Sequence, residues 1–303
     1  MKRSDLILGI FVMVIWGLNF SVIKLGVSEI DPLLLTALRF TLVALPALFF
    51  VKKPAVSWWY LLAYGWVFAI GVWGMATWSI EAGLSAGMAS VLLQMNVALG
   101  LFLGYFLLKE ALPFNKIVGA GLALGGLLIS LSVNDGSVTQ SGLLLILCAA
   151  LAWSIASIII KKAQTQQVFA FSLWAMACAP VPLLVIVYLQ SGTDVFYALP
   201  QQLNERVIFS VLFQAYPVTL LGYWIWNRLL VTYPLTTVAP LTLLVPIFGL
   251  LGGVLFYQEA LGLYKMIASV CVISGILIGL VNKQSLQRLT QRLFYSASSI
   301  SND

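Results

Sequence analysis

The first side chains that could do chemistry are an indole and an amide inside an apolar stretch, VIWGLNFSVIK at residues 14–24. Trp16 and Asn19 lie three residues apart, so on a helix they would share one face. A polar side chain within a membrane span is costly unless it faces protein or water. Indole and amide groups can stack against a small molecule and hydrogen-bond to it, so this pair predicts binding.

Similar combinations of polar and aromatic residues occur in other apolar runs. Ser90 and Gln94 are four residues apart with Asn96 adjacent, and Trp153 and Ser157 are also four apart. The alternative is that such groups only form interhelical hydrogen bonds or lie in the aromatic belts of the membrane interface. The residues predicted to bind substrate are Trp16, Asn19, Trp73, Thr77, Ser90, Gln94, Asn96, Trp153, Ser157, Tyr223 and Trp226.

Catalytic and metal chemistry are not predicted. The sequence has no histidine, and its three cysteines, Cys148, Cys178 and Cys271, are scattered through apolar runs. This pattern fits neither a metal site nor a disulfide framework. The sequence also lacks mid-span carboxylate pairs and a Ser/His pair, so we expect no enzymatic activity and no cofactor.

The composition indicates the class of protein that must hold these residues. Of the 303 residues, 61% are hydrophobic and 9% are charged, and the mean hydropathy is +1.03. These values predict an all-α polytopic membrane protein, and the first apolar run is expected to be retained rather than cleaved as a signal peptide. Ten runs approach the roughly 20 residues that a bilayer span needs: 6–27, 32–51, 58–80, 86–108, 113–133, 141–160, 169–190, 206–230, 235–257 and 264–281.

The sixteen lysines and arginines predict the orientation in the membrane. With ten spans both termini share one side, where twelve of these residues fall; Lys24, Arg206 and Lys265 fall on the other, and Arg39 lies within a span. The positive-inside rule then makes both termini cytoplasmic. The net charge of +6 is therefore a topology signal, and nucleic acid is not an expected partner. Residues 283–303 are predicted to be a cytoplasmic tail, either solvated or on the inner leaflet.

The second half of the chain repeats features of the first at nearly constant spacing. The spacing grows from 137 to 149 residues because the loop at 191–205 is longer than its counterpart. Trp16 and Lys24 match Trp153 and Lys161 at a spacing of 137, and Gly100, Gly104, Glu110, Lys116 and Gly126 match Gly249, Gly253, Glu259, Lys265 and Gly275 at 149.

Residues 1–136 and 137–282 are thus predicted to be two repeats of five spans each. Since five is an odd number, the second repeat enters the membrane from the opposite side. Inverted repeats of this kind are typical of transporters that work by alternating access, with the substrate site near the membrane midplane.

These features resemble a known family. The ten spans, the 5+5 repeat, WGLNF, LRF at 38–40 and the acidic residues Glu110 and Glu259 are similar to the EamA-type branch of the drug/metabolite transporter superfamily. The resemblance covers residues 5–282. The stretches WGLNFSVIKLGV, LRFTLVALPALFFV and APLTLLVPIFGLL more narrowly resemble bacterial inner-membrane exporters of amino-acid metabolites, the cysteine and O-acetylserine group.

The resemblance implies a cavity lined by the runs 6–27, 58–80 and 86–108 and by their repeat mates, which are the runs that carry the predicted site residues. It also implies a kink at Pro246, whereas the first repeat has Val97 at the equivalent position. The implied function is export of an amino acid or a close relative across the bacterial inner membrane.

Two other functions are alternatives. The first is a proton-coupled multidrug pump, although the small pumps of the superfamily use a glutamate in their first helix and residues 6–23 contain none. The second is a membrane-embedded sensor or accessory subunit. The expected partners are a small-molecule substrate and the bilayer, and a monomer is expected because glycine patterns such as Gly121/Gly125 and Gly275/Gly279 are explained by internal packing.

Three charged residues have open roles. Arg39 could attract a substrate carboxylate, or it could pair with Glu81 or a helix end, and the structural role is favoured. Glu110 and Glu259 are expected to cap helices beside basic residues rather than to carry protons.

Overall fold

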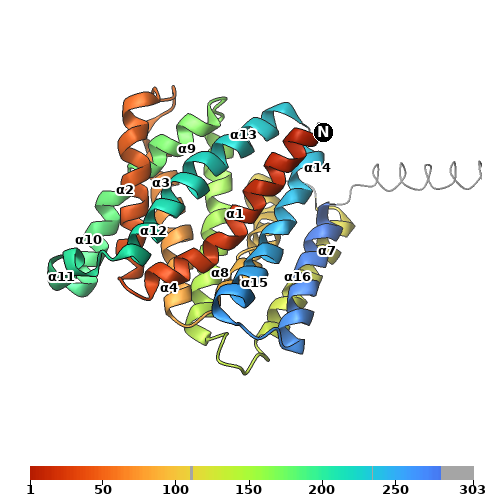
Figure 1. Cartoon of the computed structure of the whole chain (residues 1–303). Helices are drawn as coiled ribbons and strands as arrows, with labels where there is room; N and C mark the ends of the chain where they lie inside the picture. The colour runs from red at the N-terminus through yellow and green to blue at the C-terminus, as the bar shows by residue number, and fades with distance from the viewer. Residues whose placement is uncertain (110–111, 234, 281–303) are drawn as a thin grey trace, which may run out of the picture.

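The computed structural model describes residues 1–109, 112–233 and 235–280, and within them every regular element is a helix. In this part of the chain, α1 (Arg3–Val27) and α15 (Leu244–Tyr257) pack side by side in the middle of the view (Figure 1). Eight continuous helical stretches in the described residues, some made of several consecutive elements, are long and apolar enough to cross a membrane. Two shorter apolar helices accompany them. These findings confirm an all-helical, multi-pass membrane protein.

Each predicted run coincides with one helix or with consecutive helical segments, and α11 is an additional short helix within the predicted 191–205 loop. In chain order the other elements are α2 (Pro32–Phe50), α3 (Trp58–Trp66), η1 (Val67–Gly74), α4 (Met75–Glu81), α5 (Ala86–Leu92), α6 (Met95–Leu108), α7 (Phe114–Ser130), α8 (Gln140–Ala163), α9 (Val168–Ala177), α10 (Pro180–Ser191), α11 (Asp194–Gln202), α12 (Glu205–Phe213), η2 (Gln214–Leu221), α13 (Gly222–Thr232), α14 (Leu235–Val238), η3 (Ala239–Leu243) and α16 (Leu263–Leu280).

The short gap between the predicted runs 58–80 and 86–108 is a helix boundary in the structure. Gly83 adopts a φ of +97°, a left-handed conformation that favours glycine and ends α4. Ser85 then caps α5, because its side chain accepts a hydrogen bond from the backbone N–H of Met88. The hydrophobic pattern alone is nearly continuous here, so the turn is set by these two local residues.

Two π-helical segments occupy corresponding places in the two halves of the chain. η1 interrupts the helix between α3 and α4, and η2 interrupts the helix between α12 and α13. Each is eight residues long. π-helical turns are rare and are frequently found at functional sites. Both segments contribute residues to the site described below.

The run that contains Val97 is also broken, although no proline is present there. The α5–α6 boundary falls at Leu93 and Gln94, where the Asn96 side chain donates a hydrogen bond to the Leu93 carbonyl at 2.8 Å. Ser154 of α8 donates to the Asn96 carbonyl, also at 2.8 Å. Side-chain hydrogen bonds to backbone carbonyls compete with the backbone hydrogen bonds of a helix. They can therefore interrupt this run without a proline.

The matching run in the second half changes from a 3-10 helix to an α-helix between η3 and α15. Pro246 lies in the first turn of α15 and cannot donate a backbone hydrogen bond to the preceding turn. The helical pattern therefore changes beside Pro246 in this half, and the run with Val97 is interrupted at the corresponding place in the first half.

The seam between α7 and α16 is built from glycine. These helices lie side by side at the edge of the bundle (Figure 1), and a β-carbon on Gly119 or Gly275 would strike the backbone of the opposite helix. Gly126 faces the same seam, whereas a β-carbon on Gly121 or Gly125 would meet no atom within 4 Å. The seam is therefore packed by Gly119, Gly126 and Gly275, and the Gly121/Gly125 pattern is not part of it.

Candidate functional site

A small cavity of about 80 Å³ lies where segments from both halves of the chain meet. Its walls come from α1, η1, the α5–α6 break, α8, η2, α13 and the η3–α15 junction. The lining residues are Trp16, Phe20, Trp73, Leu93, Gln94, Trp153, Val218, Tyr223, Thr242 and Val245.

Aromatic side chains make up half of the lining residues. The ring centroids of Trp16 and Tyr223 are 5.3 Å apart, and those of Trp73 and Trp153 are 5.9 Å apart. Phe20 lies 6.5 Å from Trp73. These separations are typical of favourable aromatic pairs. Such a wall offers π surface and apolar contact to a ligand and adds no charge of its own.

Trp16 is held in place by the π-helical segment opposite it. Its indole Nε1 donates to the Val218 carbonyl of η2 at 3.0 Å, and Gly222 leaves the room that the ring requires. Trp226 packs 5.6 Å from Trp16, outside the lining set. The first helix is thus fixed to the second half of the chain at the cavity itself.

The cavity brings together five of the residues predicted from the sequence: Trp16, Trp73, Gln94, Trp153 and Tyr223. They are distant in sequence, and they come from the runs on which the resemblance places a cavity. Gln94 supplies an amide beside the aromatic wall, so the lining combines hydrogen-bonding capacity with stacking surface.

Three other predicted residues lie in the protein interior away from this lining. Ser90 donates to the Gly87 carbonyl at 2.6 Å and packs against Gly249 of α15. Asn96 is engaged in the α5–α6 break, and Thr77 is buried in α4. Their hydroxyl and amide groups therefore contribute to helix geometry and packing in this conformation.

Ser157 is separated from the cavity. It is exposed, and its hydroxyl donates to the Trp153 carbonyl at 2.9 Å. The polar residue that faces inward is Ser154, which is buried and bonded to Asn96. Ser157 is predicted to bind substrate because it lies four residues from Trp153 and would share its helix face. The Trp153 ring, however, reaches the cavity from a different side of α8.

Asn19 is completely buried, with 0% of its surface exposed. Neither its Oδ1 nor its Nδ2 has a hydrogen-bond partner among the described residues. It lies on α1 between the lining residues Trp16 and Phe20 but is not itself part of the lining. An unsatisfied buried amide costs free energy, so its retention here requires an explanation.

Half of the lining is not predicted from the sequence. Thr242 is the polar member of this group, and Phe20, Leu93, Val218 and Val245 are apolar. The available signal for Thr242 is its position between Pro240 and Pro246, where a broken helix exposes side chains and carbonyl groups. The apolar residues carry no distinguishing signal in an apolar chain.

Glu259 fastens three helices together at one end of the bundle. Its carboxylate accepts hydrogen bonds from the backbone N–H groups of Ala86 and Gly87, at 3.0 and 3.2 Å. Lys24 at the end of α1 forms an ion pair with it at 3.0 Å. The predicted capping role is confirmed for Glu259, whereas Glu110 lies outside the described residues.

A second ion pair lies beside the first. The Lys265 ammonium group is buried and lies 2.8 Å from the Asp135 carboxylate. Partial burial opposes ionisation of Asp135, but hydrogen bonds from Lys265 and Ser137 outweigh it and lower its pKa below the usual value. The two pairs line a polar hollow of about 360 Å³.

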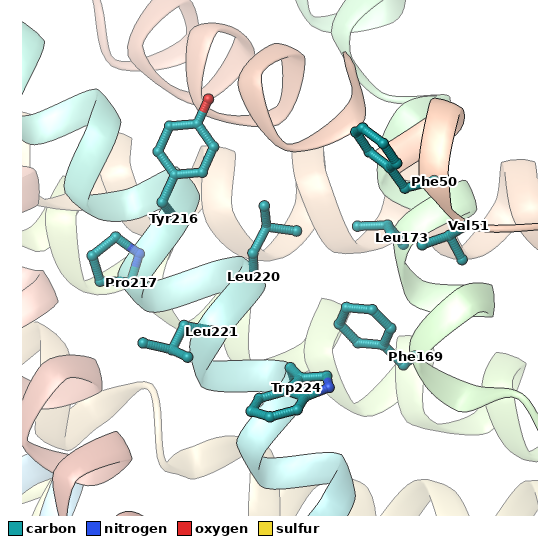
Figure 2. Close-up of a pocket in the computed structure, with 9 residues that line it drawn as sticks. All are labelled: Phe50, Val51, Phe169, Leu173, Tyr216, Pro217, Leu220, Leu221 and Trp224. Atoms are coloured by element: carbon teal, nitrogen blue, oxygen red, sulfur yellow. The ribbon is translucent and has the colours of Figure 1, made fainter. Parts of the chain in front are cut away.

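A third hollow is apolar and opens toward the side of the bundle. It measures about 550 Å³, and Figure 2 shows the rings of Phe50, Phe169 and Trp224 around it. A lining of hydrocarbon suits lipid chains better than a polar metabolite. Its residues are Phe50, Val51, Phe169, Leu173, Tyr216, Pro217, Leu220, Leu221 and Trp224.

Comparison with known proteins gives a consistent result. A family described as "EamA-like transporter family" matches residues 3–132 and 140–281. A protein of Salmonella typhimurium named "Probable amino-acid metabolite efflux pump" is 36% identical over 284 residues, covering 92% of this chain and 95% of the relative. A protein of the same name from Escherichia coli K12 is 34% identical with the same coverage.

A solved crystal structure supports the fold. Its TM-score is 0.63 at 16% identity, and the match covers 95% of this chain and 99% of the other. A similarity at this identity indicates fold alone. With the two family matches and the related sequences, however, the assignment is complete: the chain belongs to the EamA-like transporter family, and it is a multi-pass membrane transporter.

Proposed function

We propose that this transporter exports an amino acid or an amino-acid derivative across the bacterial inner membrane. The observation that carries the proposal is the neutral, aromatic cavity with Gln94 and Thr242 in its wall. Such a lining can bind a side chain by apolar contact and hydrogen-bond to amino and carboxylate groups. The printed names of the relatives, amino-acid metabolite efflux pumps, support the same substrate class.

The proposed mechanism is alternating access between two inverted repeats, 1–136 and 137–282, of five spans each. Several paired features support it: the π-helical segments η1 and η2, and the left-handed caps Lys109 and Gln258, with φ of 53° and 52°. Lys109 and Gln258 are 149 residues apart, the spacing of the sequence repeat. The chain is further proposed to work as a monomer, with Gly119 and Gly275 serving the packing of α7 against α16 within the bundle.

A carrier driven by protons needs a titratable group that reaches the substrate. Among the described residues, the cavity lining contains no carboxylate. This favours facilitated diffusion of the metabolite down its own gradient, and it disfavours the alternative of a proton-coupled multidrug pump.

The test is efflux from proteoliposomes loaded with labelled cysteine under reducing conditions or with O-acetylserine. We expect release faster than from protein-free liposomes without an imposed pH gradient, and an ionophore that collapses such a gradient should leave the initial rate unchanged. Release equal to the protein-free control would contradict the proposed substrate class. Concentrative uptake driven by a pH gradient alone would instead support the proton-coupled pump.

The proposed topology places both termini in the cytoplasm. Ser191 and Ala55 are both exposed, in segments predicted to lie on opposite sides. In a variant without the three native cysteines, a membrane-impermeant thiol reagent applied to whole cells should label Ser191→Cys and should reach Ala55→Cys only after permeabilisation. The reverse pattern would place the termini outside.

A further inference from the structure

Arg39 is a buried cation in the middle of α2. Only 1% of its surface is exposed, and its guanidinium group stays protonated at any physiological pH. The free-energy cost of burying an ionised group is high unless an opposite charge or full hydrogen bonding compensates it. The neighbours of Arg39 therefore determine whether this charge is already neutralised within the protein.

The hydrogen-bond partners of Arg39 are neutral. Nη2 and Nε donate to Thr219 Oγ1 at 2.9 and 3.2 Å, and Nη1 makes a long contact of 3.5 Å with Gln214 Oε1. Among the described residues no carboxylate forms an ion pair with it. The pairing with Glu81 considered from the sequence is not observed, so the positive charge lacks a counterion within the described part of the chain.

The cation lies directly behind the cavity wall. Its guanidinium carbon is 4.2 Å from the ring centre of Trp73, which lines the cavity. Val218, the neighbour of Thr219, is also a lining residue. The Trp73 ring, which makes a cation–π contact with the guanidinium group, lies between this charge and the space that would hold a ligand.

The two π-helical segments hold this arrangement together. Trp73 belongs to η1, whereas Gln214 and Thr219 belong to η2. Thr219 in turn donates to the Gln214 carbonyl at 2.7 Å, across the wide turn of the π-helix. The contacts of Arg39 thus join the irregular segments of both halves at the cavity.

We propose that Arg39 is a positioning residue that selects the carboxylate of the substrate, supplying through the Trp73–Tyr223 wall the positive charge that the lining itself lacks. This inference rests on the proposed function and defines its substrate class further as molecules that carry a free carboxylate. An anion in the cavity is the missing counterion, since charges interact strongly across a protein interior that excludes water. The aromatic layer keeps the anion from forming a permanent ion pair, so release stays feasible.

The test compares cysteine with cysteinamide, which lacks the carboxylate, in reducing proteoliposomes. The wild type should prefer cysteine by roughly ten-fold or more, the scale of one charge interaction in a protein interior. Arg39→Gln should lose most of this preference, chiefly through a raised KM for cysteine, whereas Arg39→Lys should retain much of it.

A second pair of variants keeps the buried arginine in place. Thr219→Asp offers Arg39 an internal counterion and should abolish the preference for cysteine. Thr219→Asn places an uncharged side chain of nearly the same shape as aspartate at this position, and it should preserve the preference. The proposal is overturned if the wild type transports both compounds equally, if Arg39→Gln and Thr219→Asp keep the wild-type preference, or if they reduce both transport rates by the same factor. Absence of cysteine and cysteinamide transport by the folded wild type would instead contradict the proposed function itself.

Discussion

Replacing Glu259 with glutamine is expected to open the bundle at the end where α1, α5 and α15 meet. The carboxylate accepts two backbone N–H groups at the start of α5 and an ammonium group from Lys24. Hydrogen bonds to a charged group contribute about 1.5–3 kcal/mol each to stability. Glutamine keeps one accepting oxygen and loses the ion pair, so we expect the free energy of unfolding to fall by about 2 kcal/mol.

We expect this substitution to affect access to the cavity from outside more strongly than it affects the free energy of unfolding. Under the proposed topology this end faces outward, and α1, α5 and α15 belong to the runs that surround the cavity. With the ion pair removed, a cysteine introduced at Thr242 in the cavity wall should react several-fold faster with an impermeant reagent applied from outside. The measurement is the labelling rate in right-side-out vesicles.

Glu29 provides the matched control. It forms an ion pair of 3.0 Å with Arg206, whose side chain is 67% exposed. Exposed pairs of this kind contribute little to stability, so Glu29→Gln should leave both the unfolding free energy and the labelling rate nearly unchanged. Equal labelling of Thr242→Cys with and without Glu259→Gln would show that this contact does not close the cavity.

Replacing Asn19 with leucine is expected to stabilise the protein and to abolish most of its transport. The two side chains share the same branched arrangement of four non-hydrogen atoms, and neither polar atom of Asn19 has a partner to lose among the described residues. Removing an unsatisfied buried amide should raise the free energy of unfolding by about 1–3 kcal/mol. Transport should fall because we propose that this amide, expected from the sequence to bind substrate, does so or bonds to a neighbouring helix in another conformation of the cycle.

Ser21→Ala is the control for this prediction. Ser21 lies on the same helix, and its hydroxyl is also buried and unpartnered within the described part of the chain, but it faces Gly252 of α15. Its removal should increase stability slightly and leave transport intact. Thermal unfolding in detergent and efflux from proteoliposomes separate the two effects, and an Asn19→Leu protein that transports at the wild-type rate would assign Asn19 no part in the cycle.

The long apolar helices could be predicted from the sequence because apolar length alone determines them. The π-helical segment η1 could not, since the sequence VFAIGVWG has no feature that distinguishes it from an ordinary apolar helix. In η2, Pro217 signals an interrupted helix but does not specify the π-helical form. Their geometry depends on tertiary contacts such as those of Arg39 and Thr219. Hydrophobic patterns thus predict where a helix lies but not where its hydrogen-bond pattern changes.

Most of the aromatic residues expected in the site line the cavity, and Trp226 is the exception. Trp16, Trp73 and Trp153 reach the cavity, whereas Ser157 does not. A serine can satisfy its hydroxyl on its own helix from any face, as the bond from Ser157 to the Trp153 carbonyl shows. The choice between Ser154 and Ser157 depends on the rotation of α8, which the sequence does not specify.

The contact between Gly119 and Gly275 has a mechanical consequence. Backbone meets backbone there, with no side chain between α7 and α16 at this contact that could change rotamer and allow sliding. The contact between α7 and α16 therefore joins the first and second halves of the chain rigidly at this edge. Movement of one half relative to the other then needs flexible segments elsewhere in the bundle. The irregular turns of η1, η2 and η3 have less regular hydrogen bonds than an α-helix, so we expect the bundle to bend there.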